Sequence, residues 1–313
     1  MRKALASLMF GLLITSGPVH AGPTTTIGMM ADTPQHFDVV LRLSAGLDHQ
    51  GGLRILPIAG KGPLQTLNDL IHLEGIDAAL LPSDVLAYAR ANGLINVADK
   101  KLSYLVKLGH LDIHLLAGKD VGSLQDLAGK RIAIGTSVEP SYITGHFLLE
   151  AAGLEFEEVP LGGAAAVKAV AEGDADAALL LGEEPLPELS SVKTRNLHLV
   201  PLQAPAAAAE VYAPALISHD DYPALLKKGN TVESLSTALI VAVFEWPRGS
   251  PQENVTAALA DGLYRVLQPD NSQSAGINFT ATVPGWQRAR VADDILKKRA
   301  ARFTQSQLAT TEN

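Results

Sequence analysis

A phrase that occurs twice constrains the fold of this chain more than any other feature. From Leu64 onward, apolar residues recur every three or four positions, as on one helix face, until Glu74 and Gly75 end the pattern. Residues 76–81 (Ile-Asp-Ala-Ala-Leu-Leu) are too few and too apolar for a surface helix, so we expect a strand covered on both faces. About a hundred residues later come a helix of small residues at 164–171, Glu-Gly again, and a second apolar strand at 174–181. Two copies predict two α/β lobes that are built alike.

The loop after each copy is the first place to look for a binding site. In open α/β sheets, ligands bind beyond the carboxyl ends of the strands, where helix N-termini point. Two such lobes facing one another would form a cleft. Its walls would include Pro82-Ser83-Asp84 in one lobe and Gly182-Glu183-Glu184-Pro185 in the other.

The amino end has the pattern of a secretory signal. Arg2 and Lys3 precede an apolar run over 4–14, and Val19-His20-Ala21 fits the small-x-small cleavage pattern. The run is too short to span a bilayer, although a membrane-anchored alternative stays open. We therefore expect a signal peptide over residues 1–21, cleavage after Ala21, and a periplasmic protein.

Composition narrows the function. The chain has no cysteine, which excludes thiol catalysis and cysteine metal sites. The formal charge of −8 becomes −10 once Arg2 and Lys3 leave with the signal, and no basic stripe is present, so we expect no nucleic-acid partner. Gly60-Lys61-Gly62 is too short for a phosphate loop, and neither G-x-S-x-G nor H-E-x-x-H occurs.

The remaining elements predict a chain that enters, leaves and re-enters its first lobe. We expect the first lobe over 22–112 and 205–313, and the second over 113–204. The stretch 201–214, rich in proline and alanine, would be the return crossing. Two connections between lobes form a hinge. The other expected strands are 24–31, 53–59, 111–117, 131–135, 156–160, 197–202 and 233–244, and the other expected helices are 36–47, 143–152, 253–267 and 291–303.

One segment resembles a known family. Residues 123–135 (Ser-Leu-Gln-Asp-Leu-Ala-Gly-Lys-Arg-Ile-Ala-Ile-Gly) are similar to the phrase that opens the second lobe of type II periplasmic solute-binding proteins. Together with 74–79, 172–178 and Tyr222-Pro223, the segment resembles the TAXI receptors of TRAP transporters. ABC-type receptors of the NMT1 or sulfonate kind share the opening phrase. The resemblance implies a two-lobed α/β periplasmic-binding-protein type II fold, each lobe a mixed sheet flanked by helices, with a hinge between them.

Two loops depart from the family pattern. TAXI receptors usually carry a Gly-Ser-Thr-Gly-Thr-Tyr-like loop after the first strand, where this chain has residues 31–36 (Ala-Asp-Thr-Pro-Gln-His). They usually carry a Gly-Ser-Gly-Thr-like turn where this chain has 136–142 (Thr-Ser-Val-Glu-Pro-Ser-Tyr). The resemblance therefore implies the fold but not the class of ligand.

The candidate ligand-binding residues are polar side chains in the loops after the strands. Each could instead cap a helix or remain solvated. None is an arginine, the residue that usually grips a carboxylate, so the loops favour a neutral, apolar or cationic ligand, although Lys61 could serve an anion. The candidates are Asp32, Thr33, Lys61, Ser83, Asp84, Thr136, Ser137, Glu139, Ser141, Tyr142, Glu183 and Glu184.

His110, Asp112 and His114 alternate along an expected strand and would share one face. Three such side chains could bind a divalent ion, or they could form hydrogen bonds across the hinge. We favour the hinge interpretation and expect no cofactor.

These observations predict an extracytoplasmic receptor and not an enzyme. It would be a monomer that captures a small molecule between its lobes and delivers it to the permease subunits of a membrane transporter, with a TRAP-type partner favoured and an ABC-type partner possible. One alternative is a receptor-like adaptor that lost transport and binds another periplasmic protein. A second is an enzyme on the same scaffold. A cleft filled by the chain's own side chains would favour the adaptor.

Overall fold

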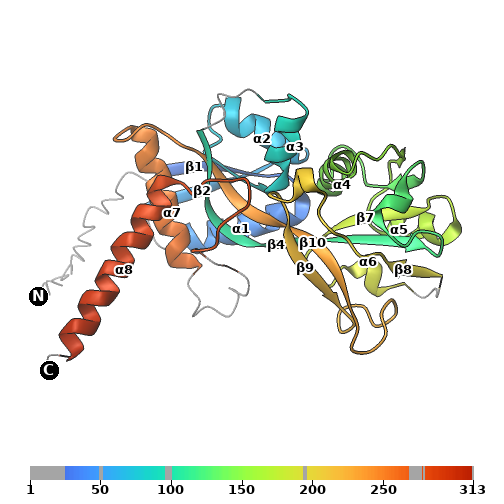
Figure 1. Ribbon diagram of the computed structural model, residues 1–313. Coiled ribbons are helices and arrows are strands. Elements are labelled where there is room, and N and C mark those ends of the chain that lie inside the picture. Colours follow the sequence, from blue (N-terminus) through green and yellow to red (C-terminus); the bar gives the residue numbers. More distant parts are fainter. Residues whose placement is uncertain are drawn as a thin grey trace, which may run out of the picture.

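The structure is a computed structural model that describes residues 25–48, 52–95, 101–192, 196–267, 277 and 279–311. The predicted signal peptide lies outside these residues. Two lobes lie side by side, and two long strands, β4 (Leu102–Gly118) and β10 (Thr231–Phe244), run through both (Figure 1).

The first lobe contains the amino-terminal elements and the last two helices. Its α8 extends away from the rest of the molecule (Figure 1). The elements of this lobe are β1 (Thr25–Ala31), α1 (Pro34–Asp48), β2 (Leu53–Ala59), α2 (Pro63–His72), β3 (Ala78–Pro82), α3 (Asp84–Ala91), α7 (Pro251–Val266) and α8 (Arg290–Thr311).

The second lobe contains the middle of the chain. Its elements are the 3₁₀ helix η2 (Leu124–Leu127), β5 (Arg131–Ala133), α4 (Pro140–Ala151), β6 (Glu157–Val159), α5 (Gly163–Glu172), β7 (Ala177–Gly182), α6 (Pro187–Ser190), β8 (Leu197–Leu199), the 3₁₀ helix η3 (Ala206–Ala208) and β9 (Ala213–Ser218).

Each lobe has its own set of parallel strands. β1 lies between β2 and β3 in the first lobe, and β5 lies between β6 and β7 in the second. Antiparallel β10 continues the first set and antiparallel β4 the second, which gives the order β2-β1-β3-β10-β4-β7-β5-β6. The predicted two-lobed α/β fold is confirmed. Hydrogen bonding also continues from one lobe to the other, because β4 and β10 pair with each other.

The repeated sequence phrase is also a structural repeat, and its aspartate has one role in both copies. The Asp77 carboxylate accepts a hydrogen bond from Gly28 N at 2.9 Å, while Asp77 N donates to Gly28 O at 2.8 Å. Asp176 makes the same pair with Arg131, at 2.9 and 2.8 Å. In each lobe the aspartate therefore ties the start of the repeated strand to its parallel neighbour.

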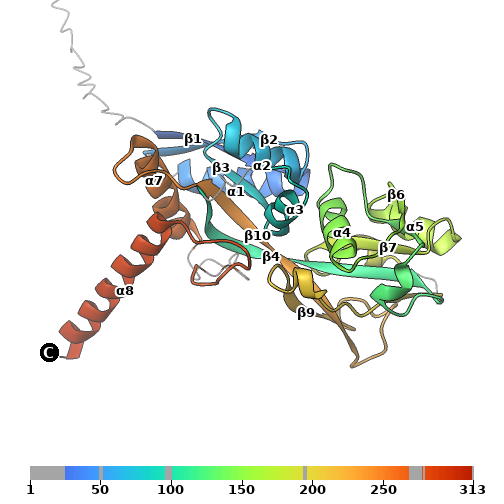
Figure 2. The same cartoon turned by 45° about the horizontal axis from the view of Figure 1, so that its top comes forward.

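The hydrophobic core shows that the lobes pack against each other. One buried cluster combines Leu67 and Val85 of the first lobe with Ile132 and Phe147 of the second. Helix α3 packs against α4 across this boundary (Figure 2). The apolar faces of these helices therefore cover the sheet where the two lobes meet.

Two elements differ from the sequence prediction. We expected the strand at 111–117 to begin after Gly109-His110, but β4 runs unbroken from Leu102 to Gly118. We expected 201–214 to be the return crossing; Ala208 and Tyr212 pack in the cluster shared by both lobes, and Ile217 and Tyr222, which follow, pack in the core of the second. This packing favours a return along β10, and the proposed lobe boundaries at 112/113 and 204/205 remain a prediction.

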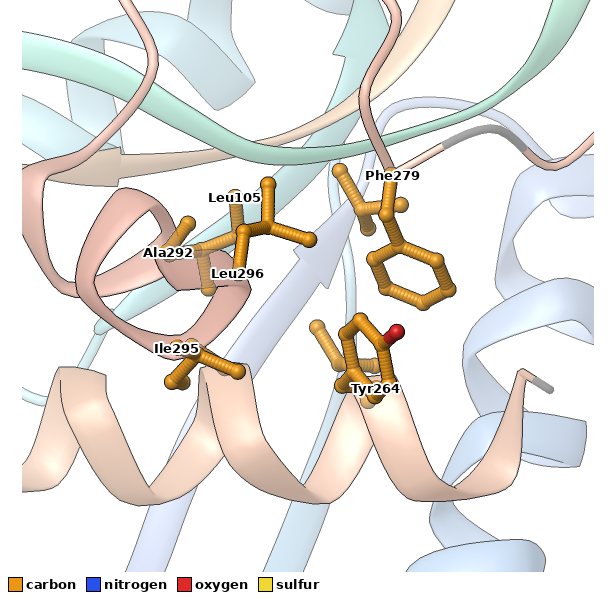
Figure 3. A pocket seen from close by; sticks show the side chains of 9 residues that line it. Leu105, Tyr264, Phe279, Ala292, Ile295 and Leu296 are labelled. Carbon is orange, nitrogen blue, oxygen red and sulfur yellow. The ribbon is translucent and has the colours of Figure 1, made fainter. Parts of the chain in front are cut away.

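A small apolar hollow lies between β4, α7 and α8, lined by Leu105, Tyr264, Phe279 and Ile295 (Figure 3). Its volume of about 10 Å³ is roughly the space of one water molecule, so it is no ligand site. Within the described residues, no helix combines the length and apolarity needed to cross a membrane.

Candidate functional site

The loops that follow the parallel strands of the two lobes meet at the lobe boundary. Gly62, in the loop after β2, lies so close to the loop after β5 that a Cβ on it would be 2.7 Å from Val138 Cα and Val138 O. Gly109, at the middle of β4, lies beside the loop after β7, because a Cβ there would be 3.2 Å from Glu183 Oε1. The predicted loops therefore surround one region, and that region is closed at the contact between Gly62 and Val138.

Asp84 is a deeply buried acidic residue of this region, with 1% of its surface exposed. It begins α3 in the first lobe, and its Oδ2 accepts hydrogen bonds from Thr144 Oγ1 on α4 at 2.6 Å and from the Tyr212 hydroxyl at 3.2 Å. Burial raises the pKa of the Asp84 carboxyl, and the hydrogen bonds from Thr144 and Tyr212 oppose this increase. Asp84 thus links the two lobes directly.

Ser83 fixes the loop after β3 to β10. Its Oγ lies 3.0 Å from Thr237 Oγ1 and accepts a hydrogen bond from Ala238 N at 3.1 Å. Its carbonyl accepts from Trp286 Nε1 at 2.7 Å. The Ser83 hydroxyl already bonds within the protein, and a ligand would have to compete with these bonds. A ligand role for Ser83 remains a prediction.

The loop after β1 places a buried carboxylate beside the start of α1. Asp32 Oδ1 pairs with Nδ1 of His36, and both side chains are buried. Thr33 Oγ1 accepts from His36 N at 3.2 Å, so Thr33 takes the capping role that we considered for it. Lys61, in the next loop, is exposed.

In the second lobe, Glu139 folds back over the loop after β5. Its Oε2 accepts a hydrogen bond from Thr136 N at 2.6 Å, and its carboxylate lies against Gly162 at the start of α5. Ser137 is exposed and Ser141 is buried beside Gly135. The predicted polar loop after β5 is present. Its own Glu139 already accepts one of the hydrogen bonds that the loop could offer to a ligand.

Tyr142 lies in a cluster of rings between the lobes. Its ring centroid is 4.4 Å from that of His146, and Tyr88 of α3 contributes a ring 6.4 Å from His146. His146 also lies 3.3 Å from Glu150 and 3.2 Å from Glu158. Burial, followed by the charges of Glu158 and Glu150, raises the pKa of the Tyr142 hydroxyl.

His110, Asp112 and His114 do not converge on one point. His114 is fully buried; its Nε2 lies 3.0 Å from the Tyr222 hydroxyl and its Nδ1 lies 3.0 Å from Asp112 O. His110 instead lies 3.4 Å from Asp112 Oδ2 at the surface. Within the described residues, no group of three or more acidic or histidine side chains is placed to hold a metal ion. The hydrogen-bonding interpretation fits these residues better than the metal interpretation.

The loop after β7 keeps its carboxylates near this hinge. Glu183 is exposed, whereas the Glu184 side chain is 18% exposed and its Oε1 lies 3.6 Å from His114 Nε2. Burial raises the pKa of Asp112; the charge of His110 opposes this increase, and the charge of Glu184 adds to it. Two carboxylates thus lie close enough to repel each other.

Sequence reasoning missed three important partners: Thr144, Tyr212 and Thr237. Each is a polar residue in an otherwise apolar or proline-rich stretch. Their bonds to Asp84 join residues 60, 128 and 153 positions apart. Local patterns carry no information about contacts of that range, so only the fold reveals them.

A family model described as "NMT1/THI5 like" matches residues 58–243, which is more than half of the chain. Among solved structures, a Xanthomonas citri protein bound to ATP aligns with a TM-score of 0.50 at 10% identity, over 81% of this chain and 90% of that one. The GluR0 ligand-binding core from Nostoc punctiforme, in complex with L-glutamate, aligns with a TM-score of 0.45 at 13% identity, over 80% and 95%. The alkanesulfonate-binding protein SsuA from Xanthomonas axonopodis pv. citri aligns with a TM-score of 0.42 at 18% identity, over 81% and 78%.

Proposed function

Because this chain belongs to the NMT1/THI5-like family, we propose that it is a receptor that captures a small molecule between its two lobes. The observation that carries this proposal is the meeting of the strand-exit loops of both lobes, with Gly62 against Val138, around several buried polar side chains. A ligand that contacts both sets of loops favours the closed form, and a partner then recognises the closed surface. Binding alone fulfils this role, and no bond is broken.

We further propose that the protein is exported, loses residues 1–21, acts in the periplasm as a monomer, and delivers its ligand to membrane permease subunits. The sequence phrases favour a TRAP-type permease. The NMT1/THI5-like match supports the ABC-type alternative, since such receptors share the opening phrase of the second lobe. The genes beside this one distinguish the two, because each transporter type has its own permease.

Native mass spectrometry of gently purified protein tests the receptor proposal. We expect a small molecule of defined mass to remain bound and to leave on mild denaturation. We also expect Ser137→Ala or Tyr142→Ala to weaken binding by about tenfold with little change in thermal stability, which calorimetry and thermal melting measure. Unchanged affinity in both variants would remove the loop after β5 from the site.

A second candidate function is supported by the bonds that Asp84 makes with Thr144 and Tyr212. Here the chain's own side chains link the lobes, which suits a receptor-like adaptor that stays closed and binds another protein. Small-angle X-ray scattering separates the two proposals: a receptor stripped of ligand should expand, and an adaptor should keep its dimensions.

A further inference from the structure

Buried acceptors without hydrogen-bond partners occur beside the strand-exit loops of the first lobe and where β4 pairs with β7. In the described part of the chain, six buried side-chain nitrogen or oxygen atoms have no hydrogen-bond partner, and five of them are oxygens near the strand-exit loops. Buried polar groups in folded proteins nearly always have partners, so such a concentration needs an explanation. The five are Asp32 Oδ2, Thr66 Oγ1, Asp84 Oδ1, Asp112 Oδ1 and Glu184 Oε1.

Three of these oxygens belong to the first lobe, at the ends of three adjacent strands. Thr66 Oγ1 lies against Gly60, and Gly60 N donates to Ala31 O at 2.7 Å, one residue before Asp32. Asp84 follows β3, and β3 pairs with β1, the strand that Asp32 follows. The Asp32 side chain has no exposed surface, and the Thr144 and Tyr212 bonds to Asp84 both go to its Oδ2.

The other two oxygens lie at the hinge. Asp112 pairs with Gly182 in the register of β4 and β7, which brings its side chain near the loop that carries Glu184. The side chains of Asp112 and Glu184 are 5% and 18% exposed. The basic side chains near Asp112 are those of His110, His114 and Lys107, and His114 is already bonded to Tyr222.

Carboxylate oxygens accept hydrogen bonds and cannot donate them. A buried carboxylate with an unpaired oxygen is stabilised by a donor, and most strongly by a cationic one. An anionic ligand would bring like charge to four acidic side chains in a low-dielectric region. The surrounding loops contain no arginine to offset it, and Lys61, the lysine of these loops, is exposed.

We propose that the lobe boundary binds an organic cation carrying two or more N–H donors, such as an amine, polyamine or guanidinium compound. This inference rests on the proposed receptor function and names the ligand class of that site. Asp32 and Asp84 accept from the ligand in the first lobe, and Asp112 and Glu184 accept from it at the hinge. The ligand enters when the loops of Gly62 and Val138 separate. A metal ion fits less well, because no three of the described side chains share a centre.

Calorimetry of the full chain with spermidine, agmatine and ethanesulfonate tests this inference. We expect spermidine or agmatine to bind, and ethanesulfonate to give no heat. Asp32→Asn and Asp84→Asn keep the side-chain shape but remove the charge, and each should weaken cation binding by about tenfold to a hundredfold. Glu172→Gln, an exposed acid on α5, makes the same charge change away from the boundary and should leave affinity unchanged.

Three results would overturn the inference: no cation binding, ethanesulfonate binding that the aspartate variants strengthen, or cation affinity that both aspartate variants leave intact. The variants are checked by thermal melting, and Asp32→Asn suffices if Asp84→Asn fails to fold. An anionic or neutral molecule found by native mass spectrometry would end the cation proposal and keep the receptor. If the chain binds neither the probes nor any molecule from its source, both the cation proposal and the receptor proposal are wrong.

Discussion

The two copies of the repeat share a backbone arrangement and differ in the space around it. Asp77 and Asp176 each tie their strand to a parallel neighbour by the same pair of hydrogen bonds. The residue they grip is Gly28 in the first lobe and Arg131 in the second. Where Gly28 has no side chain, Arg131 extends to the carbonyls of Gly173 and Asp174, at 2.8 Å each.

The length of the loop before each aspartate explains this difference. Gly75 precedes Asp77 by two residues, whereas Gly173 precedes Asp176 by three. The shorter loop brings Gly75 O so close that a Cβ on Gly28 would lie 1.7 Å from it. One residue of loop length therefore decides whether this position must be glycine or can carry a long side chain.

The ends of the two repeated strands differ as well. After β3, Ser83 and Asp84 are buried and bonded to other parts of the chain. After β7, Glu183 is exposed and Glu184 is partly exposed. The first lobe thus presents a fixed wall to the boundary, and the second lobe presents side chains with more freedom to adjust.

Gly28→Ala should give the largest effect and break the first lobe alone. Its methyl group would collide with backbone atoms of Gly75, so we expect a loss of about 3 kcal/mol or more in the free energy of unfolding. Urea denaturation measures it. Arg131→Ala, the matched change in the second lobe, should cost about 1 kcal/mol, because it removes hydrogen bonds of a side chain that is 38% exposed and leaves the backbone in place. Equal losses in the two variants would contradict this view of the loops.

Asp77→Ala and Asp176→Ala should have intermediate and similar effects. Each leaves a backbone N–H without its acceptor, which costs about 1–3 kcal/mol. Asp176 also pairs with Arg131, but the two side chains are 31% and 38% exposed, so the ion pair adds little. Urea denaturation of the two alanine variants checks this prediction. Asp77→Asn, which keeps a hydrogen-bond acceptor, serves as the control. A difference well above 1 kcal/mol between the lobes would show that the shared bonds are not the main contribution.

Asp84→Asn should give the smallest change, seen as an altered pH dependence. Because the folded pKa of Asp84 is raised, the folded chain resists losing this proton. Its stability therefore falls as pH rises from the ordinary aspartate pKa, about 4, through the raised value. The amide of the variant has no such proton to lose, so the variant should melt higher than the parent near neutral pH and lack this slope.

Asp176→Asn supplies the counterpart of opposite sign. The bonds from Arg131 hold the pKa of Asp176 below its usual range, so its contribution is present above the ordinary aspartate pKa. That contribution is lost as pH falls through the lowered value, and parent and variant should converge in acid. Melting temperatures measured at a series of pH values check both predictions. If Asp84 and Asp176 contributed the same slope of melting temperature against pH, the predicted opposite signs would be wrong.

The sequence predicted most of the fold because the two lobes repeat a local phrase. Helix and strand periodicity placed β2 at its observed bounds and most other main elements within a few residues, whereas α8 continues to Thr311, beyond the expected end at 303. β9 was missed because proline and alanine at 201–214 indicated a linker, although Ala213–Ser218 pairs with β10. β4 was divided at Gly109 because a glycine suggests a strand end, whereas its pairing with Leu239 of β10 holds it within the strand.

The placement of the candidate residues in strand-exit loops was predictable, but their bonding was not, and their role in a binding site remains a prediction. Strand-exit loops follow from topology, and Asp32, Asp84 and Glu184 do lie at the lobe boundary. The roles of Thr144 and Tyr212 depend on distant segments meeting, which no local pattern encodes. The burial that raises the pKa of Asp84 likewise arises only when α3 and α4 pack together.

The two strands shared by the lobes determine how the molecule can move. Since β4 and β10 pair with each other over residues 102–112 and 236–244, a two-stranded ribbon joins the lobes, and they cannot swing on slack connecting segments. Separation of the lobes requires torsion of that ribbon. The pairing of β10 shifts register between Leu239 and Ile240 and again between Val241 and Ala242, where a ribbon twists most readily. In the receptor that we propose, opening by such torsion keeps the backbone ladder intact, and the ribbon returns the lobes to one relative orientation.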